Sequence, residues 1–518
     1  MALLEKLSLF DYLKKQKEKT NLEEGREIHV SSPEALALLA ALSFQDHPRK
    51  MFFLFPTIYE AERFSQFLGD FVKESENFIF PYDEIFRTSA IGVSPEMNEE
   101  RLLAISSVFS SEPSILISHV SASLLSIASE EQYQKSLLSF SVGDMIMPKN
   151  FVSNLQSMGY LCVDSITSCN QYSLRGGILD IFDPSYPSPV RLEFFGDEID
   201  DIRFFHVSDE MSFEHVKNIR IHPSSLKLLT EDEIASGAFK MEKELDAEKM
   251  DCKDRLSFDD LSQRISDVVL EAKGGFLSEV NGRFYSFFKK EESSLCDYLS
   301  SYDCFVYEKE SCLDEEMEIR KKEKEYFTSA CKASSSLLGE KVYIEKKLDF
   351  KNYHSCYYVQ DDSFVIRENC FKALSYSESD FMIKEYLKEG NKIRIVLPQP
   401  NLSNYDTYLT SKGISHSIYP THSQVMLIEG RITHGYEIPL EKHVYLSAKE
   451  IFGASDQKSR FLSRYKEAKI IRKYEELKVG DYVVHEVHGV GKYLGVTVMD
   501  GLEYLKVEYA DEAMFYLP

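Results

Sequence analysis

The sequence predicts a multidomain α/β protein that also contains an antiparallel sheet. Strand-like apolar segments alternate with helical stretches through the first 120 residues. Closely spaced strand patterns, separated by proline and glycine turns, follow between residues 172 and 205. An alternating, glycine-rich segment occupies residues 477–518. The length of 518 residues, with 43% hydrophobic and 28% charged residues, fits three to four soluble globular domains.

The stretch from residue 172 to residue 205 predicts a meander of three antiparallel strands. Ile178 to Phe182 is short and apolar, and three prolines follow it. Val190 to Phe195 alternates between apolar and polar residues, a glycine turns the chain, and Ile199 to Phe205 returns. These strands are the centre of the predicted functional region.

One face of this meander combines aromatic and basic residues. Period-two alternation places Arg191 and Phe195 on the same face, and Arg203 with Phe205 on that face of the next strand. A solvated sheet face is normally polar, so aromatics flanked by arginines indicate a protein-binding hot spot. The alternative is that a neighbouring lobe covers both phenylalanines, and the pattern leaves both possibilities open.

The segments Arg-Gly-Gly-Ile-Leu-Asp-Ile-Phe and Arg-Leu-Glu-Phe-Phe-Gly-Asp-Glu-Ile-Asp-Asp-Ile-Arg resemble a known protein module. They are similar to the UvrA-binding module shared by the excision-repair protein UvrB and the transcription-repair coupling factor (Mfd) family. The similarity is long and ungapped. It implies that Arg175, Arg191, Phe195 and Phe205 contact UvrA.

The N-terminal lobe has a strand, a loop and a helix where a nucleotide-binding lobe holds its phosphate loop. The strand is predicted at Ile28 to Val30 and the helix at Glu34 to Leu42. The intervening Ser-Ser-Pro lacks the glycines and the lysine that cradle phosphates. The later Phe-Leu-Phe-Pro-Thr and Pro-Tyr-Asp-Glu runs are similar to the first lobe of the Mfd family, a degenerate RecA-like ATPase relic. The resemblance therefore implies no catalytic residue and no cofactor in this chain, with ATP and Mg belonging to the motor of the family.

The resemblance divides the chain into six parts. A Ser-rich break near residue 335 predicts a linker, and the strand Cys356 to Val359 is assigned to the domain after it. The expected parts are 1–135 (domain 1a), 136–215 (UvrA-binding domain 2), 216–330 (domain 1b, completing the first lobe), 345–452 (a small α/β domain 3), 453–474 (a basic linker helix) and 475–518 (an RNA polymerase-interacting domain).

The linker helix departs from the acidic background of the chain. The net charge of −25 argues against a protein that coats nucleic acid throughout. Arg460, Arg464, Lys469 and Arg472 nevertheless form a local basic run. Such a run is typical either of a solvated linker or of a nucleic-acid contact, and it lacks the interleaved aromatics that stack on bases.

The segment from Leu477 to Pro518 predicts a small barrel with glycine corners. It resembles the CarD-like, Tudor-like RNA polymerase-interacting domain of the Mfd family, which implies docking on the polymerase β subunit. The strand from residue 493 to residue 499 is the candidate edge for pairing with a polymerase strand. Its alternation predicts Leu494, Val496 and Val498 inside the barrel, and Tyr493, Thr497 and Met499 outside as polymerase contacts.

The resulting expectation is an adaptor that links stalled RNA polymerase to UvrA, with DNA bound mainly through the motor of the family. The alternatives are a UvrB-type damage-verification ATPase, which needs a phosphate loop, and a CarD-like regulator, which leaves residues 1–330 unexplained. The sequence stops inside the predicted barrel, and a truncated gene and a fragment of a longer chain would look the same here. Nine cysteines without a ligand pattern predict free thiols and no metal site, and the lack of an apolar run of about 20 residues predicts a cytoplasmic protein without membrane contact.

Overall fold

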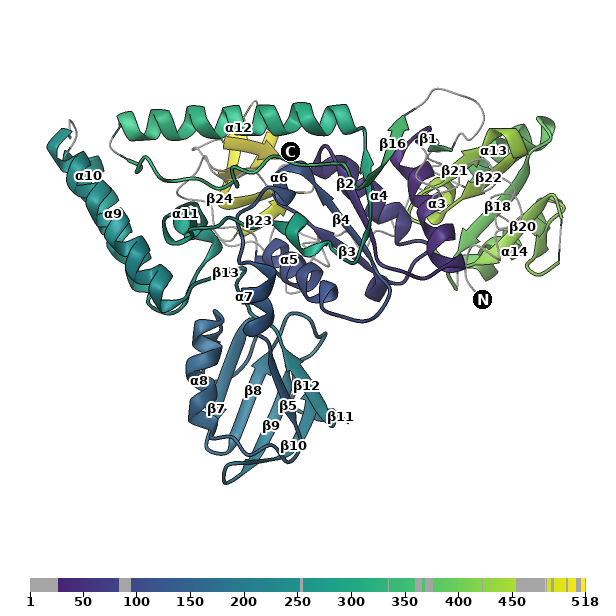
Figure 1. The fold of residues 1–518 in the computed structure, drawn as a ribbon. Coiled ribbons are helices and arrows are strands. Elements are labelled where there is room, and N and C mark those ends of the chain that lie inside the picture. Colours follow the sequence, from purple (N-terminus) through teal and green to yellow (C-terminus); the bar gives the residue numbers. More distant parts are fainter. Residues whose placement is uncertain are drawn as a thin grey trace. The chain divides into compact units, whose positions relative to one another are not determined.

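The computed structural model is a mixed α/β structure with several sheets (Figure 1). It describes residues 27–82, 95–251, 255–333, 335–358, 366–368, 376–399, 401–421, 423–452, 480, 482–485, 489–499, 502–508 and 514–517. The chain forms two compact units, one of residues 1–87 with 93–455 and one of residues 88–92 with 456–518. Among the described residues, no helix has both the length and the apolar character needed to cross a bilayer.

The first sheet of the larger unit has six parallel strands in the order β1-β16-β15-β2-β4-β3. Every residue of β2 and β4 is buried, as expected for a parallel sheet with both faces covered. The strand predicted at residues 28–30 is confirmed, and strands alternate with helices through the first 120 residues as predicted. The six strands are β1 (Ile28–Val30), β2 (Met51–Phe55), β3 (Asn77–Phe80), β4 (Ile115–His119), β15 (Asp303–Tyr307) and β16 (Tyr353–Tyr358).

The assignment of Cys356 to the small α/β domain is wrong. Cys356 lies in β16, which pairs with β15 on one side and with β1 on the other. The segment before β16 is not a free linker, because Leu337, Tyr343 and Ile344 are buried in the cores beneath it. The first sheet is therefore completed by residues as far along the chain as β16.

The helices of the first lobe lie on both faces of this sheet. Helix α3 has a Ser32 cap, whose hydroxyl accepts from the Ala35 N–H, and a proline at its first turn. The Thr57 capping box starts α4 in the same manner. The helices of this lobe are α3 (Pro33–Asp46), α4 (Ile58–Leu68), α5 (Pro95–Val108), α6 (Val120–Ser123), α7 (Glu130–Lys135) and α12 (Lys309–Lys332).

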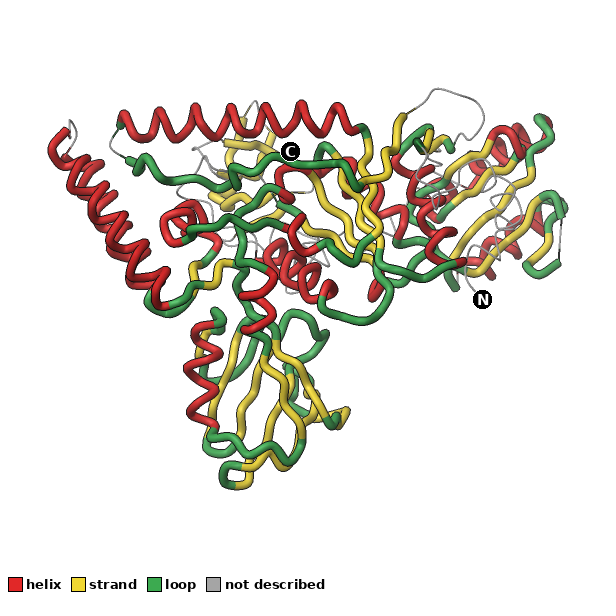
Figure 2. Tube along the Cα trace, in the orientation of Figure 1, coloured by secondary structure: helices red, strands yellow, loops and turns green. Residues whose placement is uncertain are grey.

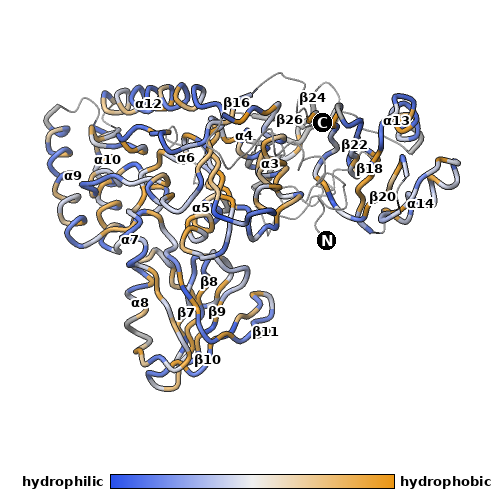
Figure 3. Tube along the Cα trace, turned by 45° about the vertical axis from the view of Figure 1, so that its right-hand side comes forward, coloured by the Kyte–Doolittle hydropathy of each residue, from blue (hydrophilic) through white to orange (hydrophobic). Residues whose placement is uncertain are grey.

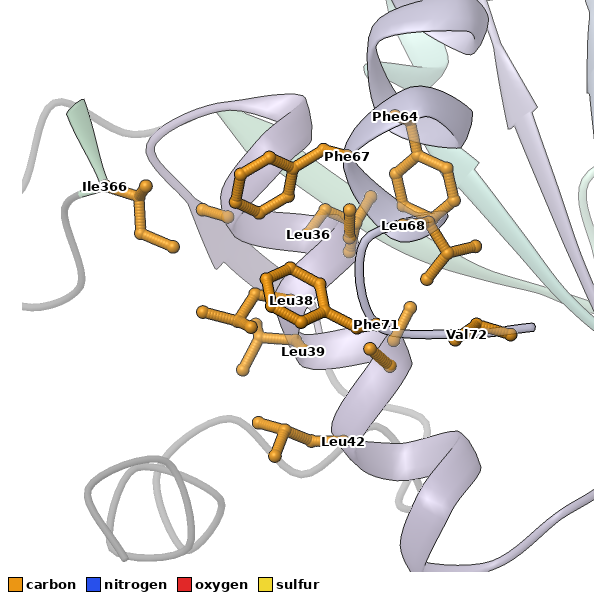
Figure 4. Close-up of a cluster of buried hydrophobic side chains, with 14 of the residues drawn as sticks. Leu36, Leu38, Leu39, Leu42, Phe64, Phe67, Leu68, Phe71, Val72 and Ile366 are labelled. Carbon is orange, nitrogen blue, oxygen red and sulfur yellow. The ribbon is translucent and has the colours of Figure 1, made fainter. Parts of the chain in front are cut away.

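Helix α3 is buried around its whole circumference, since every residue from Pro33 to Phe44 is buried. A helix that is apolar all round must be covered on every side. Figure 4 shows Phe67 and Phe71 lying beside the leucines of α3. The same core continues into the next domain through Val396, Met426 and Tyr436. Helices α3 and α4 thus lie between two sheets and join them through one hydrophobic core.

The second sheet, of residues 367–446, has the strand order β17-β21-β22-β18-β20-β19. Its central strand β18 pairs in parallel with β20 and β22, and it appears hydrophobic in Figure 3, in contrast to α9. The elements are β17 (Arg367–Glu368), β18 (Lys392–Leu397), β19 (Ser417–Ile418), β20 (Val425–Glu429), β21 (Tyr436–Ile438), β22 (His443–Leu446), α13 (Tyr376–Lys388), α14 (Asn401–Ser411) and α15 (Ala448–Phe452).

The inserted domain has a six-stranded sheet, antiparallel except for one parallel pair at its edge, with one helix on its inner face (Figure 2). The predicted three-strand meander is confirmed as β8 (Ile178–Phe182), β9 (Val190–Phe195) and β10 (Glu198–Phe205). Helix α8 (Pro148–Ser157) packs on it through Phe151 and Leu155. The remaining strands are β6 (Leu161–Cys162), β7 (Gln171–Arg175) and β11 (Ser212–His215), with β5 (Leu138–Ser141) and β12 (Asn218–Ile221) paired separately.

After the inserted domain the chain forms helices and then returns to the first sheet. Strand β15 pairs with β2, although β15 begins at Asp303, 248 positions after β2 ends at Phe55. The connecting elements are β13 (Lys227–Leu228), α9 (Glu231–Asp251), α10 (Arg255–Ala272), β14 (Phe276–Leu277) and α11 (Tyr285–Phe288).

The smaller unit contains a four-stranded antiparallel sheet in the order β23-β24-β25-β26. A bulge interrupts the pairing of β24 with β25 between Tyr493 and Gly495. The strands are β23 (Tyr482–His485), β24 (Gly489–Met499), β25 (Leu502–Glu508) and β26 (Met514–Leu517).

Candidate protein-binding face of the inserted sheet

The outer face of the inserted sheet is built from cross-strand rows of residues. Asp180, Arg191 and Arg203 form one row, because Arg191 pairs with both of its neighbours in register. Directly opposed residues of antiparallel strands point to the same face. The inner face carries Leu192, Phe194 and Ile202, which are buried against α8. The predicted division of β9 into an inner and an outer face is confirmed.

Arg191 is held inside this face rather than presented to solvent. Its Nε and Nη2 donate to the two carboxylate oxygens of Asp180 at 2.7 and 2.9 Å. Its guanidinium also lies over the ring of Phe205, 4.5 Å from the centroid. The hydrogen bonds that Arg191 donates to Asp180 raise the pKa of Arg191. The Arg191 side chain is only 12% exposed, so its hydrogen-bonding capacity is largely used within the domain.

The expectation that Phe205 is an exposed hot-spot aromatic is wrong. Phe205 is 2% exposed and forms a small core with Ile166 and Phe182. The strand pattern gave the correct face, but the segment between β6 and β7 folds over that end of it. Phe205 is covered by its own domain, not by a neighbouring lobe.

Arg175 lies at the hairpin end of the same face, in one row with Ile178 and Glu193. Its side chain is 45% exposed, and its Nη2 lies 2.9 Å from Asp180 and 3.8 Å from Glu210. Glu210 also approaches Arg191 at 3.8 Å. Sequence reasoning missed Asp180 and Glu210. Asp180 was detectable as the one carboxylate at the outward position of an otherwise apolar strand, whereas Glu210 lies in a turn whose position the sequence does not specify.

A second set of charges on the same face is also paired internally. Arg203 Nη1 lies 2.6 Å from carboxylate oxygens of both Glu193 and Asp201. His215 Nδ1 contacts the other oxygen of Asp201 at 2.9 Å. Burial alone raises the pKa of Asp201, but the hydrogen bonds from His215 and Arg203 outweigh it and lower the pKa overall. These groups therefore hold the sheet together more than they offer free charge.

Phe195 is the exposed aromatic of the face. It is 82% exposed and lies beside the turn that joins β9 to β10. Gly196 in this turn has a φ of +69°, a left-handed conformation that favours glycine. An exposed phenylalanine on a tight hairpin is a rigid apolar anchor for a protein partner.

The loop between β1 and α3 has the position of a phosphate loop without its chemistry. Pro33 supplies no N–H, and the Ser32 hydroxyl already accepts from the Ala35 N–H at 3.1 Å. The Ser31 hydroxyl accepts from the Ile366 N–H at 3.2 Å. Glu34, in the first turn, is buried and receives a 2.7 Å hydrogen bond from Arg63 Nε. A buried carboxylate replaces the cationic group that a nucleotide phosphate needs there.

The prediction that Tyr493 points outward from β24 is wrong. Tyr493 is 4% exposed, whereas Val496, predicted inside, is 45% exposed. The bulge at Leu494 changes the alternation, so the register puts Tyr493 on the same side of the strand as Val496 instead of opposite to it. The backbone from residue 495 to residue 499 pairs with β25 alone among the described strands. The predicted docking role of Thr497 and Met499 stays a prediction.

The basic run of Arg460, Arg464, Lys469 and Arg472 lies outside the described residues. Whether this run contacts DNA or forms a solvated linker stays a prediction.

Comparisons with known proteins identify two regions of the chain. The UvrB interaction domain family matches residues 138–226, which include the whole meander. The CarD-like/TRCF RID domain family matches residues 477–518. These matches define a chain that combines a UvrB-type interaction domain with a CarD-like domain.

Several known proteins are similar to this chain over almost its whole length. The chain is 25% identical over 500 residues to the transcription-repair-coupling factor of Bacillus subtilis, covering 91% of this chain and 42% of that protein. It is 25% identical over 516 residues to that of Staphylococcus aureus and 24% identical over 511 residues to that of Staphylococcus haemolyticus, in each case covering 94% of this chain and 44% of the relative. The predicted resemblance to the N-terminal half of a transcription-repair-coupling factor is confirmed. The chain spans less than half the length of these relatives.

Proposed function

We propose that this chain is the adaptor half of a transcription-repair coupling factor in nucleotide excision repair, connecting stalled RNA polymerase to UvrA in the cytoplasm. The observation that carries the proposal is Phe195, 82% exposed on a rigid hairpin inside the region that matches the UvrB interaction domain. In this proposal UvrA docks on the hairpin end of the sheet. Arg175 lies near the same end, in one row with Ile178 and Glu193, and contributes a second, weaker contact.

RNA polymerase is the proposed partner of the CarD-like region. Residues 495–499 offer backbone groups that pair on one side with β25, which supports docking of a β-subunit strand by edge pairing. Thr497 and Met499 are the proposed side-chain contacts, and the four strands are the proposed Tudor-like barrel. The basic run at residues 460–472 is proposed to lie on DNA or to serve as a solvated linker.

The first lobe is proposed to be a degenerate RecA-like lobe that holds the inserted domain in place. The Glu34–Arg63 pair and the hydrogen bonds of the loop hydroxyls support an inactive phosphate loop. The same features oppose a UvrB-type ATPase. A CarD-like regulator leaves the match at residues 138–226 without a role.

A three-component retention assay tests the adaptor role. UvrA is passed over immobilised RNA polymerase with and without this chain. The proposal predicts that polymerase retains UvrA only when the chain is present, and that Phe195→Ala removes UvrA while the chain itself stays on the polymerase. Equal retention of UvrA with and without the chain would contradict the proposal.

A further inference from the structure

The β9–β10 hairpin carries more exposed apolar surface than Phe195 alone. Glu198 pairs with Phe195 on one side of β10 and forms an isolated antiparallel bridge with Met145 on the other. Opposed residues in such pairs share a face. Phe195, Glu198 and Met145 therefore form one row across three neighbouring strand segments, about 10 Å from end to end at the usual strand spacing.

The backbone fixes the segment that carries Met145. The Ile146 N–H donates to the Asp197 carbonyl at 2.6 Å, and the Gly143 N–H donates to the Ile199 carbonyl at 2.8 Å. The side chain of Ile146 packs against the inner core of the domain. Alternation then places Met145 and Met147 outward, on the side of Phe195.

Both methionines are well exposed. Met145 is 71% and Met147 is 55% exposed. The arginines and carboxylates elsewhere on the outer face are already paired with one another. The apolar row thus adds exposed surface that no internal ion pair occupies, and flexible methionine side chains adapt readily to a partner surface.

We infer that the UvrA-docking surface extends across the hairpin from Phe195 to Met145 and Met147, so that the partner presents an apolar groove running across the strands. This inference rests on the proposed function. It adds two residues, Met145 and Met147, that lie outside the three strands of the meander. UvrA is the occupant because the row is continuous with Phe195. Glu198, exposed between the two apolar side chains, calls for a basic or amide group on the partner at the middle of the groove.

The affinity of the full chain for UvrA, measured by titration, tests the inference with Met145→Ser and a matched control. The control is Met211→Ser, because Met211 is 65% exposed in the same domain but lies next to β11, beyond the other end of β10. We expect Met145→Ser to weaken binding by about ten-fold, Met147→Ser to weaken it less, and Met211→Ser to leave it unchanged. Thermal unfolding of each variant shows whether the domain has stayed folded.

The outcomes separate this inference from the proposed function. If Phe195→Ala weakens binding and Met145→Ser does not, the docking surface ends at the hairpin and the inference is wrong. If neither substitution weakens binding, the proposed function itself is wrong. If Met211→Ser weakens binding as much as Met145→Ser, the effect is not specific to the hairpin row and the inference is wrong.

Discussion

Arg191 and Phe205 stack on each other, with the guanidinium 4.5 Å from the centroid of the ring. The same guanidinium donates hydrogen bonds to both carboxylate oxygens of Asp180. All three residues lie mostly or wholly inside the domain. Arg191 and Phe205, an arginine and an aromatic of the kind found in binding hot spots, therefore stabilise the domain that carries the hairpin.

The first prediction concerns this support. Arg191→Ala leaves the Asp180 carboxylate buried without its main partner, which costs roughly 3 kcal/mol of stability. Hydrogen exchange should accelerate in β8 and β9 of this variant. Phe195→Ala serves as the control, because its exposed ring contributes little to the fold, and its exchange should match the wild type. Unchanged exchange in Arg191→Ala would show that Asp180 does not need this arginine.

The second prediction concerns the pH dependence of the contact between the first lobe and the second sheet. Asp70 accepts hydrogen bonds from the N–H and hydroxyl of Thr433, and burial raises the pKa of Asp70 to about 7. Because the folded pKa lies above the unfolded value, the folded state binds the proton more tightly, and stability falls as pH rises from about 4 to about 7.

Asp70→Asn removes this titration while keeping an oxygen that accepts from Thr433. The thermal transition of the wild type should fall more between pH 5 and pH 7.5 than that of the variant, and the variant should be at least as stable as the wild type at the higher pH. Parallel pH profiles of the two proteins would mean that Asp70 is already ionised throughout this range.

The third prediction is that the chain does not bind ATP. The Ser-Ser-Pro loop uses its hydroxyls internally, and the buried Glu34 carboxylate repels phosphate. Isothermal titration with Mg–ATP should give no heat of binding, and Glu34→Gln should not restore it because Pro33 supplies no N–H and the Ala35 N–H stays bonded to the Ser32 hydroxyl. Micromolar binding to the wild type would overturn the account of this lobe.

The fourth prediction separates structure from docking in β24. Tyr493→Ala should destabilise the small sheet, because Tyr493 is 4% exposed. Met499→Arg should instead weaken RNA polymerase binding without loss of the sheet. Polymerase binding is compared between this chain and a version about 40 residues longer, each with and without Met499→Arg; unchanged binding by the longer variant would place the docking site elsewhere.

The sequence predicted the strands well where local pattern decides the structure. Period-two alternation correctly predicted both faces of β9, because buried and more exposed residues alternate along the whole strand. It could not show that the β6–β7 segment covers Phe205, since that contact joins residues distant along the chain. One extra residue at Leu494 moved Tyr493 to the side of the strand that Val496 shares, and a bulge of this kind has no clear mark in a single sequence. Cys356 was assigned to the wrong sheet for a related reason: a short apolar strand does not specify its neighbours.

The most direct test of the central claim is the affinity of UvrA for the full chain and for Phe195→Ala, measured side by side. The exposed ring on the hairpin is the proposed anchor, so its truncation should cost about 2 kcal/mol or more, roughly a thirty-fold loss of affinity. The unfolding profile of the variant should stay that of the wild type. An affinity for Phe195→Ala equal to that of the wild type would contradict the claim that this hairpin binds UvrA.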